Sequence, residues 1–203
     1  MIEATTESGL TTITINRTEK ANSLTREMLE ALGDAVLAAS EDETVHGLVL
    51  TGAGKVFSAG ADLEAAKAGL ATDPAWERLS GAIASAPILT IAALNGTAAG
   101  GALGMVLACD LRIAVPGAKV FYPVMKLGFL PQPSDPGRLA ALVGPARAKL
   151  ILMAGQKITA DEALAMGLFD RLSDDPLAEA RAMAADVLGA SRDHVQAIKG
   201  MIG

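Results

Sequence analysis

Aromatic side chains are scarce in this sequence, at 3% of 203 residues, and cysteine occurs only once. With so few rings, aliphatic side chains and close backbone contacts at alanine and glycine must fill the core. A single cysteine excludes a framework of disulfides. Cys109 lies in an apolar stretch with no histidine near it in sequence, which indicates a buried thiol rather than a nucleophile.

Clusters of basic residues are also missing. The formal net charge is −6, which argues against a nucleic-acid-binding surface but permits a local site for a small anionic ligand. No spacing typical of metal ligands occurs, so we expect no metal. The N-terminus, MIEATTESGL, lacks the apolar core of a secretion signal. The uncharged stretch 79–109 has the length of a membrane helix, but Pro87, Asn95 and several glycines interrupt it. We therefore expect a soluble, cytoplasmic protein.

Hydrophobic periodicity predicts strands that alternate with helices. Segments 2–7 and 10–15 flank a Ser-Gly turn and are typical of a β-hairpin. Buried strands are predicted at 47–51, 88–94 and 111–115, and helices at 25–40, 62–85 (broken near 72–74) and 100–109. This alternation favours an α/β fold with a mainly parallel sheet.

After Pro131 the pattern becomes helical. We therefore divide the chain into an α/β core over residues 1–133 and a C-terminal helical region over 134–203. Helices are expected at 137–154, 159–166, 175–189 and 191–200.

Two glycine-rich loops each follow a buried strand and lead into a helix: TGAGKVFSAGADL (51–63) and NGTAAGGALG (95–104). Two helix N-termini that converge would present fixed N–H donors to a carbonyl oxygen that becomes negative during a reaction. The glycine spacing fits neither a dinucleotide-binding fingerprint nor a phosphate-binding loop. From spacing alone, tight packing of a helix on the sheet explains these glycines equally well.

Five segments follow one another along the chain: INRTEKANSLTREMLEAL, VLTGAGKVFSAGADL, IAALNGTAAGGALGMVLACDLRIA, MKLGFLP and GQKITADEALAMGLFDRL. In this order they resemble the crotonase (enoyl-CoA hydratase/isomerase) superfamily. The resemblance spans nearly the whole chain and implies a core of repeated ββα units wound as a superhelix, with a helical C-terminal region. It also implies an acyl-CoA substrate, no separate cofactor, and a homotrimer or hexamer. We expect a C-terminal region shorter than is usual in the family.

The resemblance also implies a site. The backbone N–H groups of Ala61 and Gly101 would form an oxyanion hole that holds the thioester oxygen as an enolate develops. Two acidic positions of the family's hydratases are occupied here by Gly104 and Val124, which cannot transfer a proton. Standard hydration is therefore disfavoured, although glutamate at both positions is expected to confer some of it.

The CoA moiety would lie against the loop Ala59-Gly60-Ala61 and the chain at Lys20-Ala21. Lys55 either faces the CoA phosphates or is a solvated loop lysine, and the two interpretations carry equal weight. Asp62 borders the same loop, where capping of its helix is favoured over a contact with the substrate.

Two other residues are candidates for proton transfer. Asp135 is the best replacement acid, although a turn-forming role between two prolines is the favoured interpretation. Tyr122 either donates a proton or forms part of the pocket wall.

The sequence thus favours an acyl-CoA-binding enzyme of the hydratase/isomerase type, a lyase or isomerase of fatty acid metabolism. Two alternatives stay open. One is decarboxylation of a malonyl-type thioester, which depends mainly on enolate stabilisation. The other is a binder of acyl-CoA without catalytic activity.

Overall fold

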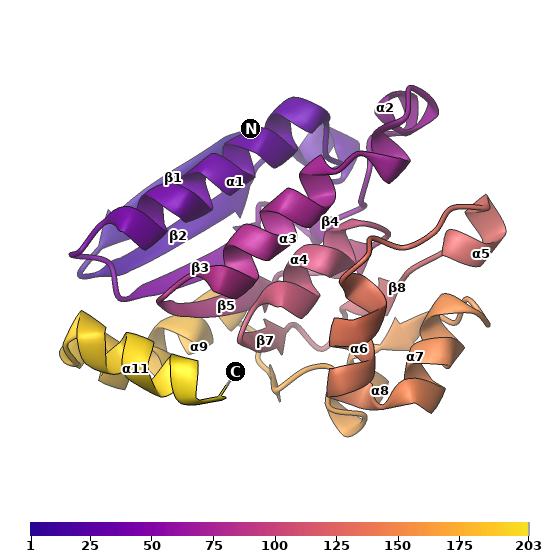
Figure 1. The fold of residues 1–203 in the computed structure, drawn as a ribbon. Coiled ribbons are helices and arrows are strands. Elements are labelled where there is room, and N and C mark those ends of the chain that lie inside the picture. Colours follow the sequence, from indigo (N-terminus) through magenta and orange to yellow (C-terminus); the bar gives the residue numbers. More distant parts are fainter. Residues whose placement is uncertain (203) are drawn as a thin grey trace.

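The N-terminal hairpin begins a six-stranded sheet (Figure 1). The structure is a computed structural model that describes residues 1–202. Positive φ angles at Ser8 and Gly9 form the tight turn that suits two twisted antiparallel strands. Every later pairing in this sheet is parallel, so the predicted hairpin and the mainly parallel sheet are confirmed. The sheet order is β1 (Ile2–Glu7), β2 (Leu10–Ile15), β3 (Gly47–Gly52), β5 (Leu89–Leu94), β7 (Leu111–Ala114) and β10 (Arg171–Leu172).

A second sheet of short strands was not predicted. Its strands β4, β6 and β8 follow shortly after the long strands β3, β5 and β7, and a helical segment comes next in each case. The chain therefore repeats a unit of long strand, short strand and helix, which is the ββα repeat that the resemblance implied. The sheet order is β4 (Val56–Ser58), β6 (Thr97–Ala99), β8 (Lys119–Phe121) and β9 (Ile158–Thr159).

Helices cover both faces of the long sheet. In Figure 1, α1 (Arg26–Glu41), α3 (Ala75–Ser85) and α4 (Ala102–Ala108) cross in front of it. Their apolar faces join the larger hydrophobic core, and every residue of α4 is buried. Helix α9 (Pro176–Met183) lies on the opposite face, where a smaller cluster forms.

The C-terminal region is helical, as predicted, but the helix expected over 137–154 is two helices. Gly144 has a positive φ and Pro145 follows it, so the first helix ends there and a second begins. Within residues 1–202 no helix is both long and apolar enough to cross a membrane. The remaining helical elements are η1 (Thr18–Lys20), α2 (Leu63–Lys67), η2 (Leu70–Thr72), α5 (Val124–Leu127), α6 (Asp135–Val143), α7 (Pro145–Leu152), α8 (Ala160–Ala165), α10 (Ala185–Gly189) and α11 (Arg192–Ile202).

Candidate active site

The two glycine-rich loops touch each other where the parallel strands β4 and β6 end. A Cβ atom at Gly60 would lie 2.6 Å from the carbonyl oxygen of Ala99 and 3.5 Å from the α-carbon of Gly100. The φ of Gly60 is also positive, at +89°. Only glycine allows both this conformation and this approach, so the loops converge as the sequence suggested.

Two backbone N–H groups are left without partners at this junction. Neither Ala61 nor Gly101 donates a hydrogen bond from its backbone nitrogen to any acceptor within residues 1–202. Adjacent amides are paired: Asp62 N donates to Leu24 O at 2.8 Å and Gly100 N to Phe121 O at 3.0 Å. Because partly buried amides are normally paired, these two donors are available to a ligand.

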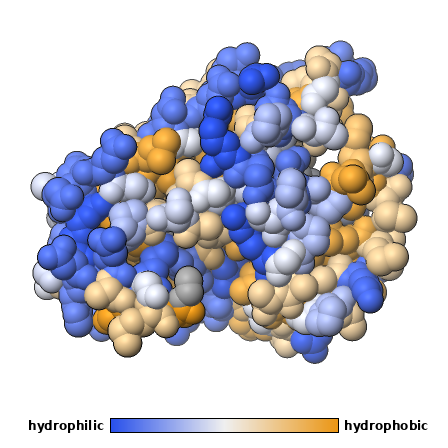
Figure 2. Space-filling model, in the orientation of Figure 1, coloured by the Kyte–Doolittle hydropathy of each residue, from blue (hydrophilic) through white to orange (hydrophobic). Residues whose placement is uncertain are grey.

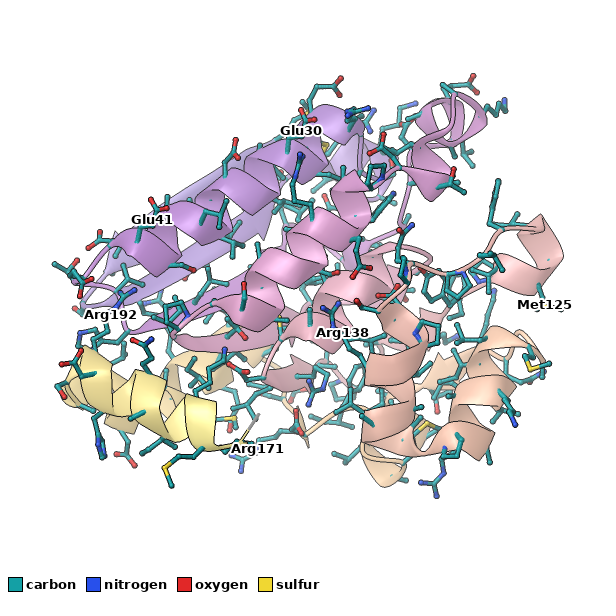
Figure 3. All side chains as sticks on the ribbon, viewed as in Figure 1. Glu30, Glu41, Met125, Arg138, Arg171 and Arg192 are labelled. Carbon is teal, nitrogen blue, oxygen red and sulfur yellow. The ribbon has the colours of Figure 1, made fainter. Side chains whose placement is uncertain are left out.

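Ala61 and Gly101 line the same cavity, which has a volume of about 380 Å³. Its walls are largely apolar, and no charged side chain lines it in the described part of the chain. On the surface, hydrophobic residues gather on the side of the molecule where α2 and α5 lie (Figure 2). Met125 projects outward from α5 at this side and is well exposed (Figure 3). The larger apolar and aromatic side chains in the walls include Leu63, Trp76, Tyr122, Val124, Leu127 and Leu130.

Trp76 explains why position 101 is glycine. A Cβ there would lie 3.0 Å from Cε3 of the indole, and the indole Nε1 donates to Leu70 O at 2.8 Å. The ring is therefore fixed against the backbone of the loop. Sequence analysis missed Trp76 and Gln132 as cavity residues, and the only signal was that Trp76 is the sole tryptophan.

The residues predicted to contact CoA lie in three kinds of place. Ala21 and Ala59 line the cavity, and Ala59 N donates to Ala21 O at 3.0 Å, so these segments lie side by side. Gly60 lies behind them in the loop junction. Lys20 and Lys55 are exposed and lie outside the cavity lining.

Asp62 is a helix cap. Its carboxylate accepts hydrogen bonds from the backbone N–H groups of Glu64 and Ala65, at 3.1 and 3.3 Å, and forms a 3.0 Å ion pair with Arg17. The hydrogen bond from Ala65 is the largest cause that lowers the pKa of this carboxyl, and the Arg17 contact adds to it. The predicted capping role is confirmed, and these contacts tie the loop to the N-terminal part of the chain.

Asp135 occupies the space beside Gly104. A Cβ at Gly104 would lie 2.8 Å from Oδ1 and 3.0 Å from Oδ2 of the Asp135 carboxyl. Gly104 belongs to α4, whereas Asp135 begins α6, and the two helices pack together. The backbone N–H of Asp135 closes a turn onto Gln132 O, as its position between prolines suggested. Its side chain, however, turns into the core and is 1% exposed.

Asp135 and Tyr122 form a buried pair. The Tyr122 hydroxyl donates to Oδ2 of Asp135 at 2.9 Å, and Oδ1 is buried without a partner within residues 1–202. Burial raises the pKa of Asp135 to about 6, and the Tyr122 hydrogen bond and the positive charge of Arg138 oppose that rise. Burial, followed by the negative charge of Asp135, raises the pKa of Tyr122 above its ordinary value.

Replacing Asp135 with asparagine should stabilise the protein above about pH 7. The raised pKa means that the folded state binds the proton more tightly than the unfolded state. The contribution of Asp135 to folding stability is therefore greatest below the ordinary pKa of about 4 and falls as the pH rises through about 6, by roughly 3 kcal/mol in all. Asparagine has no charge to desolvate, so we expect a gain of about 2 kcal/mol at high pH and little change below about pH 4.

Urea unfolding of both proteins at several pH values measures this difference. A stability difference that does not change between about pH 4 and pH 8 would contradict the assignment of the buried charge to Asp135.

Cys109 is the buried thiol that the sequence indicated. Its sulfur lies 3.3 Å from Met105 O, and burial raises its pKa to about 12. The chain has two histidines, His46 and His194. His194 is exposed, but His46 is only half-exposed, and its Nδ1 is buried without a partner among the described residues. Neither histidine lines the cavity at Ala61 and Gly101.

Comparisons with known proteins agree over nearly the whole chain. Residues 5–202 match the sequence family described as "Enoyl-CoA hydratase/isomerase". The "Probable enoyl-CoA hydratase EchA14" of Mycobacterium tuberculosis H37Rv is 40% identical over 193 residues, covering 92% of this chain and 75% of that protein. The "1,2-epoxyphenylacetyl-CoA isomerase" of Escherichia coli K12 is 33% identical over 178 residues, covering 83% and 68%.

Solved structures show the same fold. An enoyl-CoA hydratase/isomerase from Pseudoalteromonas atlantica T6c superposes with a TM-score of 0.92 at 30% identity, covering 99% of this chain and 82% of that one. The enoyl-CoA hydratase EchA8_6 from Mycobacterium marinum superposes with a TM-score of 0.90 at 31% identity, covering 99% and 98%. This chain therefore belongs to the enoyl-CoA hydratase/isomerase family, the crotonase superfamily.

Proposed function

We propose that this protein binds acyl-CoA thioesters and stabilises the thioester enolate between the backbone N–H groups of Ala61 and Gly101. The observation that carries the proposal is the pair of unpartnered amides, which belong to touching loops and line one largely apolar cavity. Family membership supplies the substrate class. The family's assembly as a homotrimer or hexamer stays a prediction for this chain.

The chemistry follows from two fixed donors. A thioester oxygen gains negative charge when the α-carbon loses a proton or a carboxyl group, so donors that point at it stabilise the transition state more than the ground state. Apolar walls exclude water and strengthen each hydrogen bond to the developing charge. In this arrangement the pantetheine arm lies against Ala21 and Ala59, and the acyl group lies against Trp76 and Val124.

A second candidate function is decarboxylation of a malonyl-type thioester. It is favoured by the absence of charged side chains from the cavity lining in residues 1–202. An apolar cavity destabilises a substrate carboxylate, and loss of CO₂ leaves the enolate that the two amides would hold. This reaction needs no acid at positions 104 or 124, where the chain has Gly104 and Val124.

The test incubates the purified protein with butyryl-CoA, crotonyl-CoA and methylmalonyl-CoA in heavy water. Deuterium at the α-carbon of butyryl-CoA, hydration of crotonyl-CoA or release of CO₂ would each identify an enolate-forming enzyme and its class. Binding of all three thioesters without turnover would leave a non-catalytic binder. Failure to bind any of them would overturn the proposal.

A further inference from the structure

We propose that Tyr122 and Asp135 form a two-residue proton relay, in which the Tyr122 hydroxyl exchanges a proton with the α-carbon of the thioester and Asp135 holds a proton for as long as the enolate exists. This inference rests on the proposed function, because it assigns the proton that the α-carbon loses when the enolate forms and regains when the enolate collapses. The resemblance to hydratases offers no such group, since the positions of their acids are Gly104 and Val124.

Tyr122 is the group that can meet the substrate. Among the described residues that line the cavity, it is the only one whose hydroxyl is hydrogen-bonded to a carboxyl group, so its side chain can give up a proton and take one back. Asp135 does not line the cavity and lies behind the tyrosine, 2.9 Å from its hydroxyl. Tyr122 is therefore the catalytic residue of the pair, and Asp135 acts through it.

The position of Asp135 ties the relay to the oxyanion hole. Its carboxyl rests against the α-carbon of Gly104, and Gly104 N donates to Gly101 O at 3.0 Å, so Gly104 lies one helical turn from the amide of Gly101. Helix α4 contributes no charged or polar side chain to this contact. The carboxyl thus fills, from α6, the space that a side chain at position 104 would need.

The proton balance closes without another reactant. With Asp135 ionised, the Tyr122 hydroxyl donates to Oδ2, as the structure has it. Removal of the α-proton transfers it to the tyrosine oxygen as the tyrosine proton passes to Asp135, leaving an enolate, a neutral tyrosine and a carboxylic acid. The acid then donates to the tyrosine oxygen, so the phenol hydrogen is free to face the cavity. Exchange of the stored proton with solvent deuterium before delivery labels the α-carbon. Delivery to the enolate reverses the transfers and restores the carboxylate.

The surroundings of Asp135 suit a group that stores a proton. The charged residues that face it are Glu77 from α3 and Arg138 from α6. Each is bound elsewhere, because Arg138 donates to Ser80 Oγ at 2.9 Å and Glu77 accepts from Ser134. Figure 3 shows Arg138 on α6, beside α3. Burial places the pKa of Asp135 at about 6, so both protonation states occur near neutrality, while the raised pKa of Tyr122 keeps that residue a neutral phenol.

The experiment measures deuterium exchange at the α-carbon of butyryl-CoA in heavy water between about pH 5 and pH 8. The wild-type rate should rise through an apparent pKa near 6 and then level off, since proton removal needs the carboxylate. Tyr122→Phe should lower the rate at least 100-fold, and Asp135→Asn at least tenfold with loss of the pH-dependent limb. Calorimetric titration should show both variants binding butyryl-CoA as the wild type does.

Ser134→Ala is the matched control, because it removes the hydroxyl's hydrogen bond to Glu77 at the start of α6 and leaves the Tyr122–Asp135 hydrogen bond in place. This variant should exchange the α-proton within about threefold of the wild-type rate, and its rate should still rise with pH. A flat wild-type profile, either variant exchanging at the wild-type rate, or Asp135→Asn slowing exchange with the limb unchanged would each overturn the relay. A wild type that decarboxylates methylmalonyl-CoA but exchanges no α-proton of butyryl-CoA would overturn the relay alone. A wild type that turns over none of the three thioesters would overturn the enolate-forming function itself. The pH dependence of the wild-type exchange rate tests the relay even if neither variant folds.

Discussion

Glutamate introduced at position 104 should destabilise the protein by about 3 kcal/mol or more, although the resemblance to hydratases suggests it as a gain of function. Its Cβ would lie 2.8 Å from one oxygen of Asp135, and its carboxyl would enter a buried space that already holds a carboxyl. Overpacking costs about 1–3 kcal/mol, and a second unpaired buried charge adds to it. Chemical unfolding of Gly104→Glu and of Gly104→Ala, which adds only the Cβ, separates the two contributions.

Removing the carboxyl of Asp135 should restore stability to the Gly104→Glu variant. In Gly104→Glu combined with Asp135→Gly, the new side chain can occupy the vacated space and accept the Tyr122 hydrogen bond. A double-mutant cycle should therefore give a coupling energy of at least about 2 kcal/mol. Independent, additive effects would mean that the two positions do not share this space. With Val124→Glu added, the rescued protein is the proper test of hydration of crotonyl-CoA.

The long elements could be predicted from the sequence because their apolar residues form a pattern over enough positions to be recognised. In helix α1 the buried residues recur at helical spacing, whereas strands β3 and β5 are largely apolar runs that are buried along nearly their whole length. Strands β4, β6 and β8 have three residues each and lie within or beside turns, so alternation cannot be recognised there. The second sheet exists because these pieces pair with one another in space, and local sequence carries no trace of that pairing.

The residues of the candidate site also differ in how far they could be predicted from the sequence. Small residues at Ala61 and Gly101 and the resemblance around them drew attention to two amides that the structure leaves without partners within residues 1–202, because the exposure of a backbone donor depends on local conformation. The place of Asp135 could not be predicted, since it depends on α6 packing against α4 across many intervening residues. The sequence favoured a turn role for Asp135, whereas its backbone forms the turn and its side chain is buried against Gly104.

Gly101→Pro should lower the rate of α-proton exchange at least 100-fold relative to Gly101→Ala, which is about 2.7 kcal/mol or more of transition-state stabilisation. Proline lacks the N–H that the thioester oxygen would accept, and the φ of Gly101, −58°, already suits a proline ring. The fold loses no hydrogen bond, because this amide has no partner within residues 1–202.

Alanine is the matched control for that substitution. Both variants place a Cβ about 3.0 Å from the Trp76 ring, so both require the same small shift of the indole, but only alanine keeps the donor. We would measure both α-proton exchange of butyryl-CoA and thermal unfolding for each variant. Together these measurements distinguish a loss of activity from a loss of folding. If the two folded variants were equally active, the Gly101 amide would have no part in holding the enolate, and the cavity would stabilise it by other means or not at all.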